Sequence, residues 1–205
     1  GQAVPLPAHV PLGPEDLSSG AADEKLRGLA EQAAVVIIDT PGHDTPLSRW
    51  AHEQADLLVT PINDSFVDLD VLAEMSLNPV RILRRSHYCD LALAARRSRS
   101  SLGKSMQWLV LRNRLAHMEA RNRKQISEAL STLAADLGIT EGPGLRERVI
   151  YRDAEHFGET SLGHVAARQE LRSLLEAVQE SLKGATENAH EDAQGEPQAS
   201  VAGRS

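Results

Sequence analysis

The sequence predicts an α/β domain built on a parallel sheet. Two observations carry this prediction: short apolar runs end in polar residues, and helical patterns stand between those runs. The runs cover Val35–Asp39, Asp56–Ile62 and Met106–Leu111. Continuous apolar runs are typical of strands buried on both faces of a parallel sheet, and strand–helix alternation is typical of a doubly wound fold. A chain of 205 residues is long enough for one such domain.

The stretch VVIIDTPGHD, residues 35–44, constrains function most. A buried strand here ends at Asp39, and ligands of open α/β sheets lie beyond the carboxyl ends of strands. A carboxylate in that place can hold Mg²⁺ or a water bound to it. Gly42 lacks a Cβ, so its backbone N–H can approach a phosphate closely. The alternative is a buried strand that only happens to end in Asp and a Pro-Gly turn.

The remaining elements follow from spacing and from helix breakers. Four prolines make residues 1–14 an extended linker or loop. Apolar residues at helical spacing predict helices over 15–34, 45–55, 67–75, 88–101, 117–137 and 165–182. Pro79 interrupts a basic, irregular stretch over 78–87, and 146–151 is predicted as a fourth strand. The folded part therefore spans 15–183, and the polar stretch 184–205 is predicted to be a disordered tail.

Positive charge is concentrated in one part of the chain. From Arg81 to Lys124 there are twelve Lys or Arg and two acids, so this stretch carries +10 and leaves −17 on the rest of a chain of net charge −7. Such a local excess indicates an anion or nucleic-acid contact, although a solvated helix face is the alternative. Aromatic residues make up only 3% of the chain, which favours contact with phosphates over base stacking.

Composition and missing motifs exclude several classes. The single cysteine, Cys89, excludes a disulfide framework, a cysteine-only zinc site and a chain-borne Fe–S cluster, and it favours a cytoplasmic setting. No apolar run has membrane-spanning length. Gly103-Lys104-Ser105 matches the end of a phosphate-binding loop. However, Ser98 stands where the first glycine belongs, and a predicted helix precedes the triplet, so we interpret it as coincidence.

Four blocks of sequence together resemble one family. They are VVIIDTPGHD, RWAHEQADLLVTPINDSFVDLDVL, LVLRNRLAHMEARNRKQ and GPGLRERVIYRD. This combination is similar to the MipZ-like ATPases, which position the division plane and belong to the ParA/MinD group of deviant P-loop ATPases. The resemblance covers about residues 30–182.

The resemblance implies a three-layer, Rossmann-like P-loop NTPase fold and a bacterial protein associated with the nucleoid. Members of the family bind Mg²⁺ and ATP, form an ATP-dependent homodimer and hydrolyse ATP slowly. The dimer binds double-stranded DNA without sequence preference. MipZ-like members also bind the centromere-binding partition protein and block polymerisation of the tubulin-like division protein. No membrane contact is implied.

Family roles carry over to matching positions only. Asp39 matches the switch II aspartate near Mg²⁺, and Gly42 matches the glycine that senses the γ-phosphate, with Thr40 and Pro41 between them at the nucleotide. Asn113 matches the asparagine that reads the adenine edge. The positions that match DNA-contacting residues are Arg121, Arg146 and Arg148, with Lys124 as a weaker candidate. Gln125 stands where the family often has a further basic residue.

Two departures from the family pattern matter. The family's first strand, its P-loop and its switch I aspartate have no counterpart in this sequence, so we expect a fragment that neither binds ATP tightly nor hydrolyses it. Residues 152–164 are shorter and less apolar than the usual segment that borders the nucleotide. Three alternatives stay open: a ParA-type partitioning ATPase, a DNA-tethering regulator that lacks a P-loop, and an ATP-dependent ligase of the same superfamily.

Overall fold

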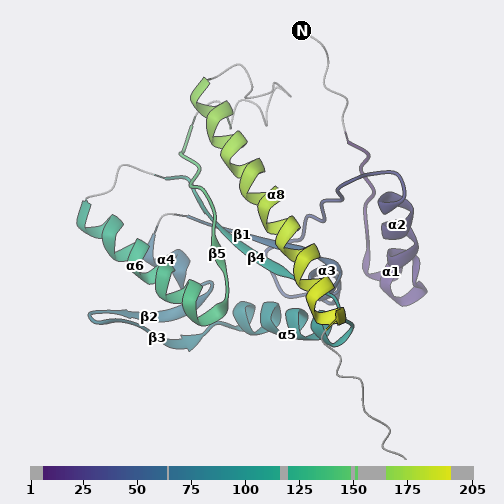
Figure 1. Cartoon of the computed structure of the whole chain (residues 1–205), viewed down its shortest axis with the longest axis horizontal. Helices are drawn as coiled ribbons and strands as arrows, with labels where there is room; N and C mark the ends of the chain where they lie inside the picture. Colours follow the sequence, from purple (N-terminus) through teal and green to yellow (C-terminus); the bar gives the residue numbers. More distant parts are fainter. Residues whose placement is uncertain (1–6, 64, 116–119, 149–150, 152–164, 195–205) are drawn as a thin grey trace, which may run out of the picture. The chain divides into compact units, whose positions relative to one another are not determined.

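The computed structural model describes residues 7–63, 65–115, 120–148, 151 and 165–194. The chain forms two compact units, residues 1–54 and residues 55–205, and each is described by itself. Figure 1 shows the elements of both units in sequence colours.

The first unit contains three helices: α1 (Pro14–Ser19), α2 (Ala21–Ala30) and α3 (Pro46–Gln54). The single helix predicted over 15–34 is therefore divided in two. Gly20 lies between the parts with a φ of 78°, a left-handed conformation that glycine adopts without steric cost and that ends α1. Lys25 of α2 donates to Asp16 of α1 at 2.7 Å, so an ion pair joins the two short helices. The predicted helix over 45–55 is confirmed as α3.

The predicted strand over Val35–Asp39 is wrong in this structure. The segment has no regular secondary structure, Val35 is 60% exposed and Ile37 is 88% exposed. β-branched residues favour a strand only where a neighbouring strand and a packing surface receive them. The described residues of this unit form only helices besides loops, so the apolar run has no strand partner within its own unit. Sequence pattern alone could not reveal that missing partner.

The second unit contains a parallel sheet, a hairpin and four helices among its described residues. Its strands are β1 (Leu57–Asn63), β2 (Ala73–Leu77), β3 (Val80–Arg85), β4 (Gln107–Asn113) and β5 (Thr140–Glu141). Its helices are α4 (Phe66–Leu69), α5 (His87–Ser101), α6 (Ala120–Leu137) and α8 (Val165–Gln194). The parallel sheet has the order β1-β4-β5, and the hairpin pairs β2 with β3. Two predicted strands and two predicted helices are confirmed as β1, β4, α5 and α6.

Strand β4 lies at the centre of the sheet and is covered on both faces. Residues 108–111 are all buried, as expected for a central parallel strand. Trp108 and Val110 point to the face packed by α5 and α6, while α8 contacts β4 and β1. Because side chains alternate along a strand, Leu109 and Leu111 point to the opposite face. Helices on both faces of a parallel sheet confirm the predicted α/β class.

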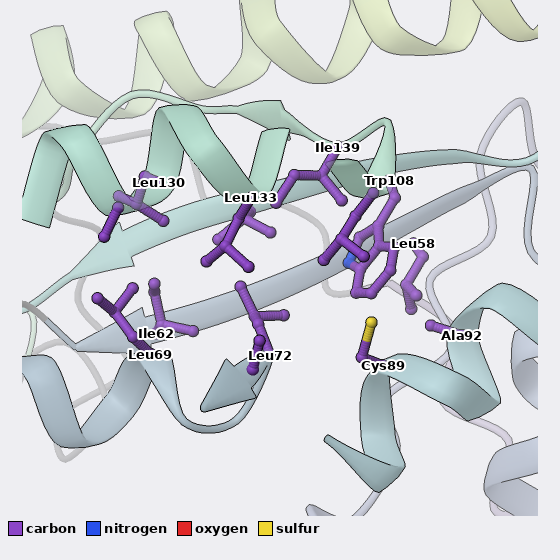
Figure 2. Close-up of a cluster of buried hydrophobic side chains, with 14 of the residues drawn as sticks. Leu58, Ile62, Leu69, Leu72, Cys89, Ala92, Trp108, Leu130, Leu133 and Ile139 are labelled. Carbon is purple, nitrogen blue, oxygen red and sulfur yellow. The ribbon is translucent and has the colours of Figure 1, made fainter. Parts of the chain in front are cut away.

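The core is assembled mainly from α5, α6 and the two long strands (Figure 2). Its largest fully buried side chains include Trp108, Leu72 and Leu130. Figure 2 shows Leu130 and Leu133 of α6 facing Leu72, with Trp108 above Cys89 of α5. Burial of apolar side chains at this density is the main stabilising term of the unit.

The hairpin corrects the prediction for residues 67–87. Only Phe66–Leu69 is helical, and the stretch 73–85 that was predicted as helix and irregular chain is antiparallel β2–β3. Met75 lies opposite Ile82, and Leu77 lies opposite Val80, so a short period-2 pattern packs one face on the core. Basic residues on β3 obscured that pattern, and Pro79 occupies the turn.

The chain after α6 also differs from the prediction. Gly138, with a φ of 60°, ends α6 as expected. The third strand of the sheet begins at Thr140, and hydrogen bonds to β4 and the residues after it continue along residues 142–147. Of the predicted strand 146–151, the described residues are 146–148 and 151, and among these only Arg146 forms a β-bridge, to Leu115. The Gly-Pro-Gly sequence predicted a loop, but the segment pairs with β4. Gly142 and Leu145 supply the N–H donors of this pairing, so Pro143, which has no N–H, is not required as a donor.

Helix α8 confirms the last predicted helix and extends it. It runs to Gln194, so regular structure continues past the start of the predicted tail at residue 184. Residues 195–205 lie outside the described residues. The short segment 152–164, which differs from the family pattern, lies outside them as well.

Candidate functional site

Polar residues meet where β1 and β4 end. Asn63 and Asn113 are partners in the parallel register, so their backbones lie side by side at the carboxyl edge of the sheet. The side-chain oxygen of Asn113 accepts a hydrogen bond from the N–H of Arg114 at 2.9 Å. Arg114 has a φ of 51°, which is uncommon for a residue with a side chain. Asn113 therefore stabilises a sharp turn of the backbone at the sheet edge.

Two further arginines stand close to this turn. The N–H of Leu115 donates to the carbonyl of Leu145 at 2.9 Å, and Leu115 forms a parallel bridge with Arg146. This pairing brings Arg146 beside the residue that follows Arg114, and both arginines are exposed. Arg112 is largely buried and lies 3.8 Å from Glu141. The carboxyl edge of β4 thus presents exposed cations next to one that is already paired.

The guanidinium of Arg148 is paired with a carboxylate of the same chain. Its Nε and one terminal nitrogen donate to the carboxylate of Glu170 on α8, at 3.1 and 2.6 Å. The hydroxyl of Tyr151 donates to the same carboxylate at 3.1 Å. The hydrogen bond from Arg148, followed by that from Tyr151, holds the pKa of Glu170 below its ordinary value against the effect of burial. We call these three residues the α8 clasp.

The other predicted DNA contacts are placed on α6. Lys124 is 79% exposed and lies 3.7 Å from Glu128, one turn along the helix. Arg121 belongs to the first turn of α6, and its side chain lies outside the described residues. Because α6 follows the chain that leaves β4, its first turn comes shortly after Arg114 in sequence. The structure leaves the DNA role of these residues untested.

Two arginines of the basic stretch, Arg96 and Arg99, form hydrogen bonds inside the protein that support its core. Arg96 donates to the carbonyls of Leu137 and Gly138, at 2.8 and 3.1 Å, and its guanidinium lies 5.7 Å from the ring centre of Trp108. It therefore caps the carbonyl end of α6. Arg99, whose side chain is 5% exposed, donates to Asp56 and to the carbonyl of Ser105. Burial lowers the pKa of Arg96.

Gly103-Lys104-Ser105 is not a phosphate-binding loop. It connects the end of helix α5 to strand β4, whereas a phosphate-binding loop leads from a strand into a helix. Gly103 has a φ of 68°, and the N–H of Lys104 donates to the carbonyl of Arg99 at 3.0 Å. The triplet is a helix-ending turn, which confirms that its match to the motif is coincidence.

The residues predicted to face the nucleotide lie in the loop before α3. Asp39, Pro41 and Gly42 are exposed, and Thr40 is half-buried. A Cβ built on Gly42 meets nothing within 4 Å, so the fold itself does not require glycine there. The loop ends at Thr45, whose N–H and hydroxyl exchange hydrogen bonds with Ser48 and cap α3.

The described residues do not form a complete nucleotide site. Asp39 belongs to the first unit and Asn113 to the second, and each unit is described by itself. Among the described residues, no three His, Cys, Asp or Glu side chains gather as metal ligands. A magnesium ion bound with a nucleotide needs only one or two carboxylates, so Asp39 is chemically suitable.

Sequence reasoning missed the partners of the arginines. Glu170 lies in the helix predicted over 165–182, and Tyr151 lies in the strand predicted over 146–151, with no contact predicted for either. Glu170 is 22 residues from Arg148, so no local spacing rule links them.

Within the described residues, no helix is both long enough and apolar enough to cross a membrane.

The comparisons with known proteins bear on the whole folded region. None of the curated proteins compared with the chain matches it. The family model described as ATPase MipZ matches residues 12–182, which cover most of both units and include every predicted site residue. The parallel sheet with helices on both faces agrees with that family's P-loop NTPase class. The chain belongs to the ATPase MipZ family.

Proposed function

We propose that the chain binds double-stranded DNA without sequence preference through the arginines that follow β4. The observation that carries the proposal is the bridge between Leu115 and Arg146, which brings Arg146 close to Arg114 with both side chains exposed. We expect Arg121 and Lys124, which belong to the helix that follows, to add further phosphate contacts. Exposed cations can neutralise phosphates and release counterions, which gives binding without base reading.

The chain belongs to a family of ATPases that act in positioning the division site. In our proposal, Asp39 and Gly42 act beside Mg²⁺ and the terminal phosphate of ATP, with Thr40 and Pro41 between them, and Asn113 contacts the adenine. Mg²⁺–ATP, when bound, would supply the terminal phosphate for hydrolysis, and Asp39 and Asn113 would be among the residues that hold it. The chain's own residues contribute a carboxylate, backbone N–H groups and a side-chain amide.

The proposed cellular role follows from the family. An ATP-dependent homodimer associated with the nucleoid binds the centromere-binding partition protein and inhibits the tubulin-like division protein. The alternative is a DNA tether without catalysis. Nucleotide dependence separates the two.

The test is a salt series with a matched pair of variants. Binding of a labelled duplex of mixed sequence is measured for the unaltered chain, Arg146→Ala and Arg97→Ala. Arg97 is also exposed, but it lies on α5, which leads into the opposite end of β4. Loss of one phosphate contact should lower the slope of log affinity against log salt by about 0.9 in Arg146→Ala only. Equal slopes in all three proteins would remove the DNA surface.

The same titrations, run with and without Mg²⁺–ATP on the protein encoded by the full reading frame, address the nucleotide, because no counterpart of the family's P-loop was identified in this sequence. ATPase function predicts that ATP strengthens duplex binding and that Asp39→Ala removes the increase. Affinity that is identical with and without ATP, in both proteins, supports the tether. An increase that persists in Asp39→Ala would contradict the switch II role of that residue.

A further inference from the structure

The α8 clasp neutralises a predicted DNA contact. Arg148 presents two parallel N–H groups to Glu170, the arrangement that arginine also uses to bind phosphate. Arg146, two residues earlier, is exposed and does not share this bidentate partner. Two arginines that the family pattern treats alike are therefore in different states.

Glu170 is held firmly in place. Besides Arg148, it accepts from the hydroxyl of Tyr151, and the backbone N–H of Arg146 also contributes to lowering its pKa. Tyr151 lies close to α8, with its hydroxyl 3.4 Å from the carbonyl of Ala167. The carboxylate therefore keeps several donors when one of them leaves, so losing Arg148 does not strand a buried charge.

The ion pair is accessible to a competing anion. The side chains of Arg148 and Glu170 are 22% and 16% exposed, which is low for a surface pair and high for a core pair. The clasp begins two residues after Arg146, so a duplex lying on Arg146 would bring phosphates near it. Phosphate and carboxylate offer the guanidinium similar geometry.

We propose that Glu170 masks Arg148, and that a duplex phosphate competes with Glu170 for the same guanidinium. This inference rests on the proposed DNA binding and adds an autoinhibitory contact to it. Binding then requires one internal ion pair to open, which weakens affinity for any duplex. A change in α8 that moves Glu170 away would release Arg148 and strengthen binding.

The test compares two variants that change net charge equally. Glu170→Gln removes the masking carboxylate, and Glu176→Gln removes an exposed carboxylate farther along the same helix. Each is titrated with the mixed-sequence duplex over a salt series, together with Arg148→Ala and the double variant of Arg148→Ala with Glu170→Gln. Circular dichroism establishes that each variant is folded.

Glu170→Gln should gain one phosphate contact. Its affinity for the duplex should therefore be about eightfold higher at about 0.1 M salt, and its slope of log affinity against log salt should be steeper by about 0.9. Glu176→Gln should change affinity less than about twofold, and the double variant should lose the gain. Equal behaviour of the two Glu→Gln variants would overturn the masking while leaving DNA binding intact. Absence of salt-dependent binding in every protein, the unaltered chain included, would overturn both proposals.

A measurement on the unaltered chain decides the matter where Glu170→Gln fails to fold. The side-chain N–H resonance of Arg148, assigned by its loss in Arg148→Lys, is followed by NMR as duplex is added. Exchange of partners predicts that this resonance moves with the same midpoint as binding. A resonance that stays fixed while other arginine resonances move would overturn the inference.

Discussion

The arginines at the two ends of β4 look alike in sequence and differ in the structure. Before the strand, Arg96 and Arg99 donate to backbone carbonyls and to Asp56 and support the packing of α5 and α6. After the strand, Arg114 and Arg146 are exposed. The first group stabilises the fold, and the second is available to a ligand.

The difference shows what a charge count measures. The stretch from Arg81 to Lys124 carries +10 along the sequence, but distant acids neutralise part of it. Arg85 pairs with Asp136 and Arg112 pairs with Glu141. Because these acids lie outside the stretch, its surface charge is smaller than its sequence charge. The charge that this stretch presents to solvent is therefore smaller than its sequence suggests.

Removing an internal arginine should have the largest effect on stability. We expect Arg99→Ala to lower the free energy of unfolding by about 2–3 kcal/mol, because charge-assisted hydrogen bonds and packing are lost. Arg97→Ala, which changes an exposed neighbour, should stay within about 0.5 kcal/mol. Urea unfolding followed by circular dichroism measures both. Similar losses in the two variants would contradict the division into internal and exposed arginines.

An intermediate effect should appear as a pH dependence at the α8 clasp. The pKa of Glu170 is lowered in the folded protein, mainly by the hydrogen bond from Arg148. Its stabilising contribution is therefore fully present above the ordinary glutamate pKa and is lost as the pH falls through the lowered value. The difference in unfolding free energy between the unaltered chain and Glu170→Gln should shrink as the pH falls from about 7 to about 3.

Thermal unfolding of both proteins at each pH measures this difference. Glu176→Gln is the control, because Glu176 is an exposed carboxylate on the same helix. A difference that stays constant across the range would show that the charge of Glu170 does not contribute to the clasp.

The smallest effect is expected at Lys124. Its ion pair with Glu128 is exposed and spans one helical turn, so Lys124→Ala should cost about 0.3–0.5 kcal/mol. Its effect on duplex binding should exceed its effect on stability if it belongs to the DNA surface. Glu128→Ala breaks the same pair and keeps the cation, so it provides the control. A loss of duplex affinity as large in Glu128→Ala would assign the effect to the helix.

The sequence predicted the central strands because their signals are local. Each of these signals lies within a single element: the apolar runs of β1 and β4, the helical spacing of α5 and α6, and Gly138 at the end of α6. The family resemblance added the site residues by position, and the family match confirms the family itself. Of the predicted DNA contacts, Arg146 and Lys124 are exposed, as contact with a phosphate requires, while their role stays a prediction.

The remaining features depend on partners that are distant in sequence. Val35–Asp39 has a strand composition, but a strand also needs a neighbour to pair with. The role of Arg148 depends on Glu170, which a different element supplies. In each case the deciding contact is tertiary, and local patterns contain no record of it.

The chain has two tryptophans, and each unit holds one of them. Trp50 of α3 donates to Asp23 at 2.9 Å in the first unit. Trp108 donates to Thr60 at 2.9 Å in the core of the second. Replacing either one by phenylalanine leaves a single tryptophan, whose fluorescence can be excited selectively, in a chosen unit. Melting curves recorded on the two single-tryptophan proteins can therefore show whether the units lose structure together or one after the other.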